Sequence, residues 1–140
     1  KAAVNIAKAH PDLDQRSHIV VASYNGVVLL AGQTPREELK QMAEQAASGV
    51  QRVKRVHNEL QILQPSSALA RSNDSWLTTK IKTQMLADNS VPSSRIKVIT
   101  ENGIVYLLGL VTRQEGSRAT NLVQGVAGVQ RIVKLFEYID

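Results

Sequence analysis

The sequence predicts an α+β protein made of two tandem copies of one small domain, each with two helices on one face of a three-stranded mixed sheet. Three observations predict this fold. Two segments of the chain repeat each other, each copy holds an Asn-Gly pair between two apolar runs, and a helical stretch follows each pair of runs. A long period with only two copies indicates duplicated domains and not a solenoid.

The repeat can be read directly from the letters. Residues 19–32 read IVVASYNGVVLLAG and residues 96–109 read IKVITENGIVYLLG, so the copies are offset by 77 residues (96 minus 19). Further on, GVQRV at residues 49–53 matches GVQRI at residues 128–132, with an offset of 79 (128 minus 49). The slip of two residues places a small insertion between these segments.

Each Asn-Gly pair predicts a tight β-hairpin. A type I′ turn needs positive φ at both central positions, which Asn and Gly tolerate, and β-branched residues flank both pairs. The predicted strand pairs are Ile19–Tyr24 with Val27–Gly32, and Arg95–Glu101 with Ile104–Leu110.

A helix is expected after each hairpin. Thr34 and Thr112 are typical N-cap residues, and Glu37 and Glu115 suit the positive end of the helix dipole. Gly49 and Gly128 then lie where the chain must reverse. The closing strands are predicted at Val50–Leu63 and Val129–Ile139.

A helix also precedes the second hairpin. It is predicted from about Ser75 to Ala87, with its N-cap among Ser72, Asn73 and Asp74. Its counterpart in the first copy is the stretch that ends near Ala9, which we expect to be a truncated helix. We therefore predict a first domain at residues 1–63, a linker at 64–71 and a second domain at 72–140.

Composition excludes several kinds of site. There is no cysteine, so the chain holds no disulfide and no thiolate metal site. The three histidines, His10, His18 and His57, have no second ligand at helical spacing, so we expect no metal. No phosphate-binding loop or nucleophile elbow is present, and we expect no catalytic residue, no cofactor and no enzymatic activity. The apolar runs are far shorter than the roughly 20 residues that span a bilayer.

The charge of the chain favours an anionic partner without choosing one. The formal net charge is +5, with eight Lys and Arg against six Asp and Glu in residues 1–70 and nine against six in residues 71–140. Phospholipid head groups, nucleic acid and acidic proteins all fit this balance, and so does ordinary solubilising charge. Aromatic residues are only 4%, which argues against nucleic acid, because single strands bind by stacking on aromatic side chains.

The order of these features resembles the BON domain: a hairpin with Asn-Gly, Leu-x-Gly at the strand end, a helix, then Gly-Val-x-x-Val and a closing strand. Two copies in tandem, with NDSWLTTK at residues 73–80, resemble the dual BON-domain outer-membrane lipoproteins of Gram-negative bacteria. The resemblance covers nearly the whole chain. Its most specific parts are Asn73–Lys80 and Thr100–Thr112.

The resemblance implies a non-enzymatic periplasmic protein at the inner leaflet of the outer membrane. It implies an anchor through a lipidated cysteine that would lie upstream of these residues, and a role at division sites and in outer-membrane integrity. It further implies that the leading helix of the second domain binds anionic phospholipid, with Trp76 and Leu86 in contact with lipid, and the family's glycine at the end of the middle strand falls on Gly109. A less specific implication is a periplasmic protein-interaction adaptor without direct lipid binding, and the oligomeric state stays open.

Helix geometry gives an independent view of the leading helix. At about 100° per residue, one arc gathers the residues that we expect to face the core: Leu77, Ile81, Gln84, Met85 and Asp88. Trp76, Lys80 and Thr83 lie to one side of this arc, and Leu86 lies almost opposite it with Thr79 and Lys82. The predicted lipid-binding residues are Trp76, Thr79, Lys80, Lys82, Thr83, Leu86 and Gly109.

Two of these residues also have purely structural interpretations. An indole beside lysines is typical of a membrane interface, but Trp76 packed against the other domain or the linker is the alternative. Gly109 has a counterpart in Gly32, and its presence in both copies favours a close backbone approach or a bulge over lipid contact.

Overall fold

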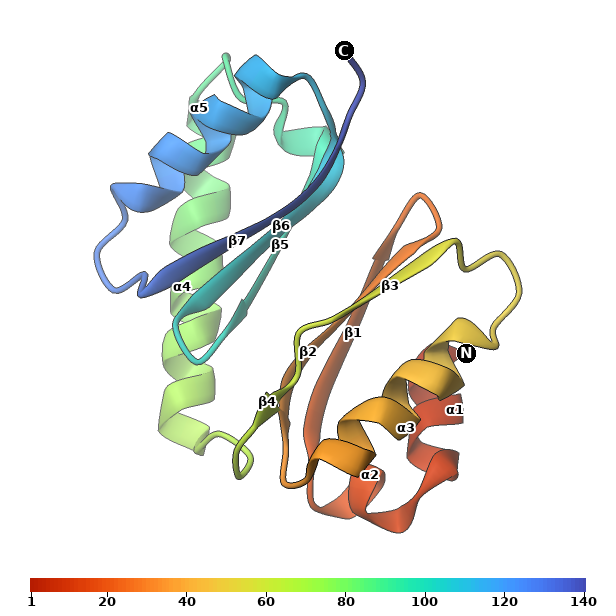
Figure 1. Ribbon diagram of the computed structural model, residues 1–140. Coiled ribbons are helices and arrows are strands. Elements are labelled where there is room, and N and C mark those ends of the chain that lie inside the picture. The colour runs from red at the N-terminus through yellow and green to blue at the C-terminus, as the bar shows by residue number, and fades with distance from the viewer. The chain divides into compact units, whose positions relative to one another are not determined.

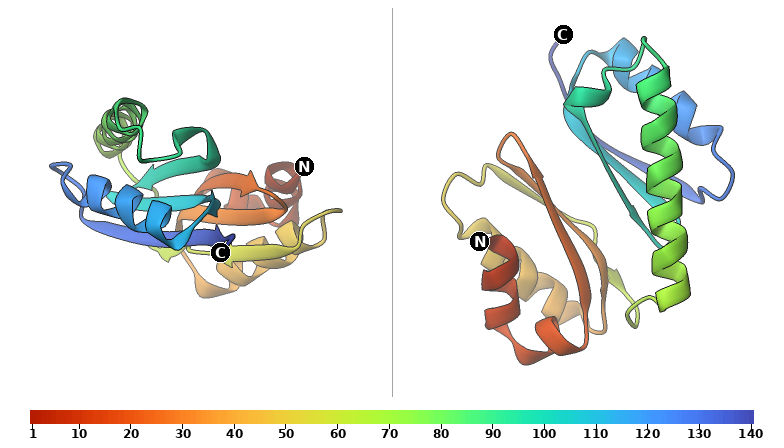
Figure 2. Two further views of the ribbon diagram at one scale, coloured as in Figure 1. Left: turned by 90° about the horizontal axis from the view of Figure 1, so that it is seen from above. Right: turned by 180° about the vertical axis from the view of Figure 1, so that it is seen from behind.

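The computed structural model describes residues 1–140 and divides the chain into two compact units, Lys1–Ser67 and Ala68–Asp140. Each unit has its own sheet and its own hydrophobic core, with the helices on one face of the sheet (Figures 1 and 2). The predicted α+β fold with two tandem domains is therefore confirmed.

Unit 1 contains a mixed sheet whose central strand is β2. Strand β1 pairs with β2 in antiparallel fashion, and β3 and β4 both pair with β2 in parallel. Its elements are α1 (Ala2–Ala9), α2 (Pro11–Gln15), β1 (His18–Tyr24), β2 (Val27–Thr34), α3 (Glu37–Ser48), β3 (Arg55–Asn58) and β4 (Gln61–Ile62).

The closing strand of unit 1 is shorter than predicted and divided in two. Residues 50–54 form a turn, in which Arg52 has a left-handed φ of 72°, so the strand begins at Arg55 and not at Val50. The Asn58 side chain then interrupts the ladder, because its Oδ1 accepts a hydrogen bond from the Leu60 amide at 3.4 Å. Side-chain bonds of this kind compete with regular strand pairing.

Unit 2 has the strand order β5-β6-β7, with β5 antiparallel and β7 parallel to the central β6. Its elements are α4 (Ala68–Ala87), the 3-10 turn η1 (Ser93–Arg95), β5 (Ile96–Glu101), β6 (Ile104–Val111), α5 (Arg113–Gln124) and β7 (Arg131–Tyr138). The core forms where α4 and α5 pack on the sheet, with Leu77, Ile81 and Met85 entering it from α4.

Both hairpin turns have the predicted backbone. Asn25 and Gly26 have φ values of 53° and 80°, and Asn102 and Gly103 have 53° and 76°. Positive φ at two successive positions defines the type I′ turn and matches the twist of the flanking strands. The Asn-Gly prediction is confirmed in both copies.

The predicted helix ends are confirmed only in part. Thr112 caps α5 with a complete capping box, since its side chain accepts from Glu115 N–H while Glu115 accepts from Thr112 N–H. Thr34 instead lies at the end of β2, where its hydroxyl bonds to the Ser17 hydroxyl at 2.8 Å, and α3 begins after Arg36 without a side-chain cap. Gly49 ends α3 as predicted.

Gly128 lies between α5 and β7, where the sequence predicted that the chain reverses. The helix ends at Gly125, and Gly128 lies in the turn that follows, with a φ of 98°.

Helix α4 begins seven residues before the predicted start at Ser75 (75 minus 68), and Asp74 is not its N-cap. Asp74 is only 4% exposed, and its carboxylate accepts hydrogen bonds from the amides of Asn102 and Gly103 at 2.8 and 2.9 Å. The carboxylate therefore ties the helix to the β5–β6 turn, and residues 68–73 continue the helix beyond it.

We expect Asp74→Ala to destabilise unit 2 by about 3 kcal/mol, because two buried backbone donors lose a charged acceptor. Denaturant unfolding followed by circular dichroism measures the loss. Asp74→Asn keeps the shape and one acceptor oxygen, so its loss should be about half as large. An Asp74→Ala protein as stable as the parent would contradict this role.

The 3-10 turn η1, which precedes β5, is linked to helix α5 by a salt bridge. Arg95 lies 2.7 Å from Glu115, and the pKa of the Glu115 carboxyl is held below its ordinary 4.5, first by the hydrogen bond from the Thr112 amide and also by Arg95. A carboxyl with a lowered pKa stabilises the fold above its unfolded pKa, and that contribution disappears as the pH falls through the folded pKa. In Glu115→Gln, the free energy of unfolding should therefore fall less steeply as the pH is lowered into the acid range. An equally steep fall in the variant and the parent would argue against this contribution.

Candidate functional site

The core side of helix α4 is a narrow stripe. Leu77, Ile81 and Met85 are buried in the core, and Asp74 continues the stripe toward the start of the helix. Gln84 and Asp88, which the helical arc placed on the core side, are exposed instead. Both residues lie at the edge of the buried stripe, and their polar side chains reach solvent.

The opposite side of α4 carries three exposed apolar side chains. Trp76 is 60% exposed, Leu86 is 73% exposed and Leu69 is 81% exposed. Leu69 was missing from the sequence prediction because the helix was expected to begin six residues after it (75 minus 69). With a rise of about 1.5 Å per residue, Leu69 and Leu86 stand about 25 Å apart, and Trp76 lies between them.

We call this side the α4 outer face. It consists of Leu69, Ser72, Trp76, Thr79, Lys80, Thr83 and Leu86, with Lys82 beside it. All of these side chains except that of Lys80, which is half-buried, are exposed. The structure thus brings six of the seven predicted site residues onto the outside of one helix.

The outer face has positive but no negative charge. The only carboxylate of α4 belongs to Asp74, which lies on the buried side and is occupied by two amides. Lys80 lies beside Trp76, with its Nζ 5.9 Å from the centre of the indole ring, and donates to the Ala127 carbonyl at 3.2 Å. This contact holds a cation next to the exposed aromatic ring.

One threonine of the outer face already donates its hydroxyl within the helix. The Thr79 hydroxyl donates back to the Ser75 carbonyl of the same helix at 3.0 Å, so its hydrogen-bonding group is already occupied.

Gly109 lies apart from the outer face. It sits in β6 opposite Ile96, with a φ of 152°, and an added Cβ would collide with the Arg95 carbonyl. Gly32 has a φ of 116° and the same relation to the His18 carbonyl. At both glycines the backbone of the neighbouring strand therefore lies too close for a side chain. This is the structural role that the presence of a glycine in both copies favoured.

The leading helix of unit 1 has no comparable face. Helix α1 is eight residues long, and its one large exposed apolar residue is Val4. It has lysine but no aromatic side chain. The two copies therefore share their fold and differ in their leading helices.

No cluster of three or more His, Cys, Asp or Glu side chains is placed to hold a metal ion. None of the helices is both long and apolar enough to cross a bilayer.

The sequence of the chain matches a known protein family over both units. The BON domain matches residues 3–64 and again residues 73–140. The chain belongs to the BON domain family. The resemblance drawn from the hairpin and helix motifs is thereby confirmed, and each BON domain corresponds to one structural unit.

Named relatives resemble the chain over nearly its full length. Outer membrane lipoprotein DolP of Haemophilus influenzae is 38% identical over 97% of this chain and 70% of its own length. The 21 kDa hemolysin of Actinobacillus pleuropneumoniae is 34% identical, with 100% of this chain and 72% of the relative covered. Osmotically-inducible protein Y of Escherichia coli is 31% identical, with 94% and 67% covered.

Proposed function

We propose that this tandem BON-domain chain is a non-enzymatic protein of the bacterial envelope that binds anionic phospholipid membranes through the α4 outer face. The observation that carries the proposal is the exposure of Leu69, Trp76 and Leu86 on a helix whose outside bears no carboxylate. A helix of this kind lies in the membrane interface, with its apolar side chains at the acyl boundary and its cations at the phosphates.

The arrangement of Trp76 and Lys80 suits the head-group region of a membrane. An indole favours the head-group region, where the ring is partly apolar and its N–H finds a partner. Lys80 is held beside the ring by its contacts with Trp76 and the Ala127 carbonyl. When the ring enters the interface, the ammonium group would meet lipid phosphate.

Charge supplies the preference for anionic lipid. A lysine near an anionic leaflet contributes about 1 kcal/mol, so Lys80 and Lys82 together favour anionic over neutral membranes by about 2 kcal/mol, or about thirtyfold in affinity. This attraction is screened by salt. Binding should therefore weaken as ionic strength rises.

The relatives indicate where this surface would act. One of them is named as an outer membrane lipoprotein. We place the present chain in the periplasm, tethered to the inner leaflet of the outer membrane by a lipidated cysteine upstream of Lys1, with a role in outer-membrane integrity and at division sites. A tether of this kind keeps α4 close to the leaflet, so modest affinity is enough for steady contact.

Vesicle co-sedimentation tests the proposal. The chain should pellet with phosphatidylglycerol vesicles, less with phosphatidylcholine vesicles, and less again as salt is added. Lys80→Gln with Lys82→Gln should weaken binding by about thirtyfold. The matched control is Lys8→Gln with Lys134→Gln, which removes the same charge elsewhere and should have a much smaller effect. Equal losses from both pairs, or no binding to anionic vesicles, would overturn the proposal.

A further inference from the structure

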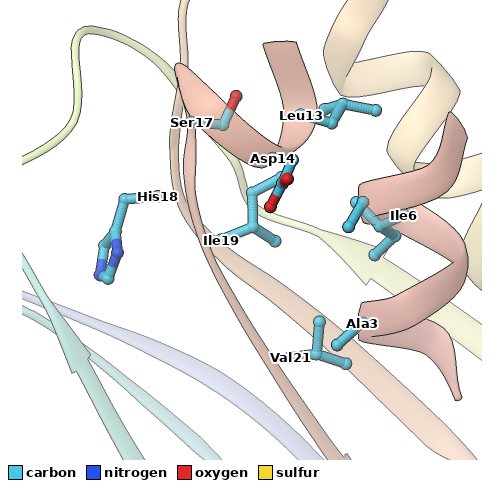
Figure 3. Close-up of a pocket in the computed structure, with 9 residues that line it drawn as sticks. Ala3, Ile6, Leu13, Asp14, Ser17, His18, Ile19 and Val21 are labelled. Atoms are coloured by element: carbon cyan, nitrogen blue, oxygen red, sulfur yellow. The ribbon is translucent and has the colours of Figure 1, made fainter. Parts of the chain in front are cut away.

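Unit 1 contains an open cleft of about 240 Å³ between α1, α2 and strand β1 (Figure 3). Its wall combines polar groups with the apolar side chains of Ile6, Leu13, Ile19 and Val21, and Ala3 of α1 lies beside Val21. Asp14 and Ser17 lie at its lip, while the side chain of His18 points away from it. We call it the β1 cleft.

The duplicated unit shows why this cleft is unusual. Ile19 and Val21 of β1 correspond to Ile96 and Val98 of β5 by the repeat and by hairpin register. Ile96 and Val98 are only 9% and 3% exposed and lie inside the core, whereas Ile19 and Val21 are only partly buried. The same two apolar positions are closed in unit 2 and open in unit 1.

The difference comes from the leading helices. Helix α4 packs mainly against β5 and covers it with Ile81 and Met85, while α1 packs mainly against α3 and turns Ala3 and Ala7 toward the cleft. The small side chains of α1 leave Ile19 and Val21 of the strand only partly covered. The cleft is therefore a consequence of the sequence of unit 1.

The uncovered strand is also at the edge of its sheet. Strand β1 pairs only with β2. Tyr24 and Val27 flank the two-residue turn, and because ladder bonds alternate along an antiparallel pair, the amides of Ile19 and Val21 point away from β2. These two residues thus present unpaired backbone groups at the edge and apolar side chains in the adjoining cleft.

We infer that the β1 cleft binds an extended peptide, which adds as a strand to β1, inserts a large apolar side chain over Ile19 and Val21, and places a basic side chain beside Asp14. Residues paired across strands project to the same face, so a peptide residue opposite Val21 directs its side chain into the cleft. Peptide addition to an edge strand beside a pocket is a common mode of recognition.

Size and charge support this occupant. A cavity of about 150 Å³ already holds benzene, so the β1 cleft has room for a phenylalanine ring. Asp14 is exposed, has no hydrogen bond or ion pair within the chain, and is the only carboxylate lining the cleft. A negative lip favours a basic peptide side chain and disfavours an anionic lipid, whose acyl chain would in addition leave the edge amides unpaired.

Amide NMR shifts of the chain, titrated with a blocked heptapeptide, test the inference. The probe is Thr-Val-Thr-Phe-Thr-Lys-Thr, and we expect saturable shifts at Ile19 and Val21 but not at the matching amides of Ile96 and Val98. Replacing the probe's phenylalanine by glycine should weaken binding about tenfold or more. Replacing its lysine by glutamate should weaken binding about threefold, and Asp14→Asn should remove that preference.

Two variants separate the cleft from general effects. Ala3→Leu fills the cleft without loss of helix propensity and should abolish the shifts, while Asn5→Leu makes the same helix more apolar outside the cleft and should not. Trp76→Glu should leave peptide binding intact, because the inference does not depend on the membrane proposal. Absence of saturable shifts, equal shifts in both units, or shifts with decanoate but not with the peptide would overturn the inference.

Discussion

Gly109→Ala is expected to unfold unit 2 or to destabilise it by about 3 kcal/mol or more, the largest stability loss that we predict for a single small substitution. The φ of 152° is one that a residue with a Cβ rarely adopts, and the added methyl group would collide with the Arg95 carbonyl. Relief would require β5 and β6 to separate at the Ile96 pair. Thermal or denaturant unfolding measures the effect.

The matched control lies in the same unit. Gly125 has a φ of −79°, and the nearest atom to an added Cβ is 3.4 Å away. Gly125→Ala should therefore change stability by no more than about 0.5 kcal/mol. A Gly109→Ala protein that unfolds like the Gly125→Ala protein would show that the close strand approach is not required.

Replacing Leu69, Trp76 and Leu86 together by serine should abolish detectable binding to phosphatidylglycerol vesicles, with a loss of at least about a hundredfold in affinity. The three side chains are largely exposed, so the free energy of unfolding should change little. Vesicle pelleting measures the binding, and circular dichroism confirms the fold.

A second triple variant tests specificity. Val4, Leu63 and Ile139 are also exposed and apolar but lie outside α4. Their replacement by serine should leave vesicle binding within about threefold of the parent, because scattered exposed apolar residues are ordinary on a protein surface. Equal losses in both triple variants would mean that apolar surface in general, and not the α4 outer face, drives binding.

Local chemistry explains why much of this fold could be predicted. The Asn-Gly turns depend on backbone conformations that few residues tolerate, so their strands and registers followed from two letters in each copy. The Thr112 capping box involves residues only three apart. The exposed Trp76 followed from the helical period, because Leu77, Ile81 and Met85 define a core stripe that does not include position 76.

The features that escaped prediction depend on contacts between distant residues. Asp74 is a residue type that often caps helices. Its carboxylate instead bonds to the amides of Asn102 and Gly103, 28 and 29 residues away, and the helix continues on both sides of it. With the helix start misplaced, Leu69 was excluded from the outer face. Gly109, in contrast, was grouped with the α4 residues through family resemblance, but its counterpart Gly32 had already favoured the close backbone approach that the structure shows.

Fluorescence of Trp76 tests the central claim most directly, because it is the only tryptophan of the chain. With phosphatidylglycerol vesicles at low salt, its emission should shift to the blue and become protected from acrylamide, while brominated acyl chains should quench it. Phosphatidylcholine vesicles should produce a much smaller change. The contradicting result is a chain that pellets with anionic vesicles while the emission maximum of Trp76 stays at long wavelength and acrylamide still quenches it fully. That result would show that another surface binds the membrane.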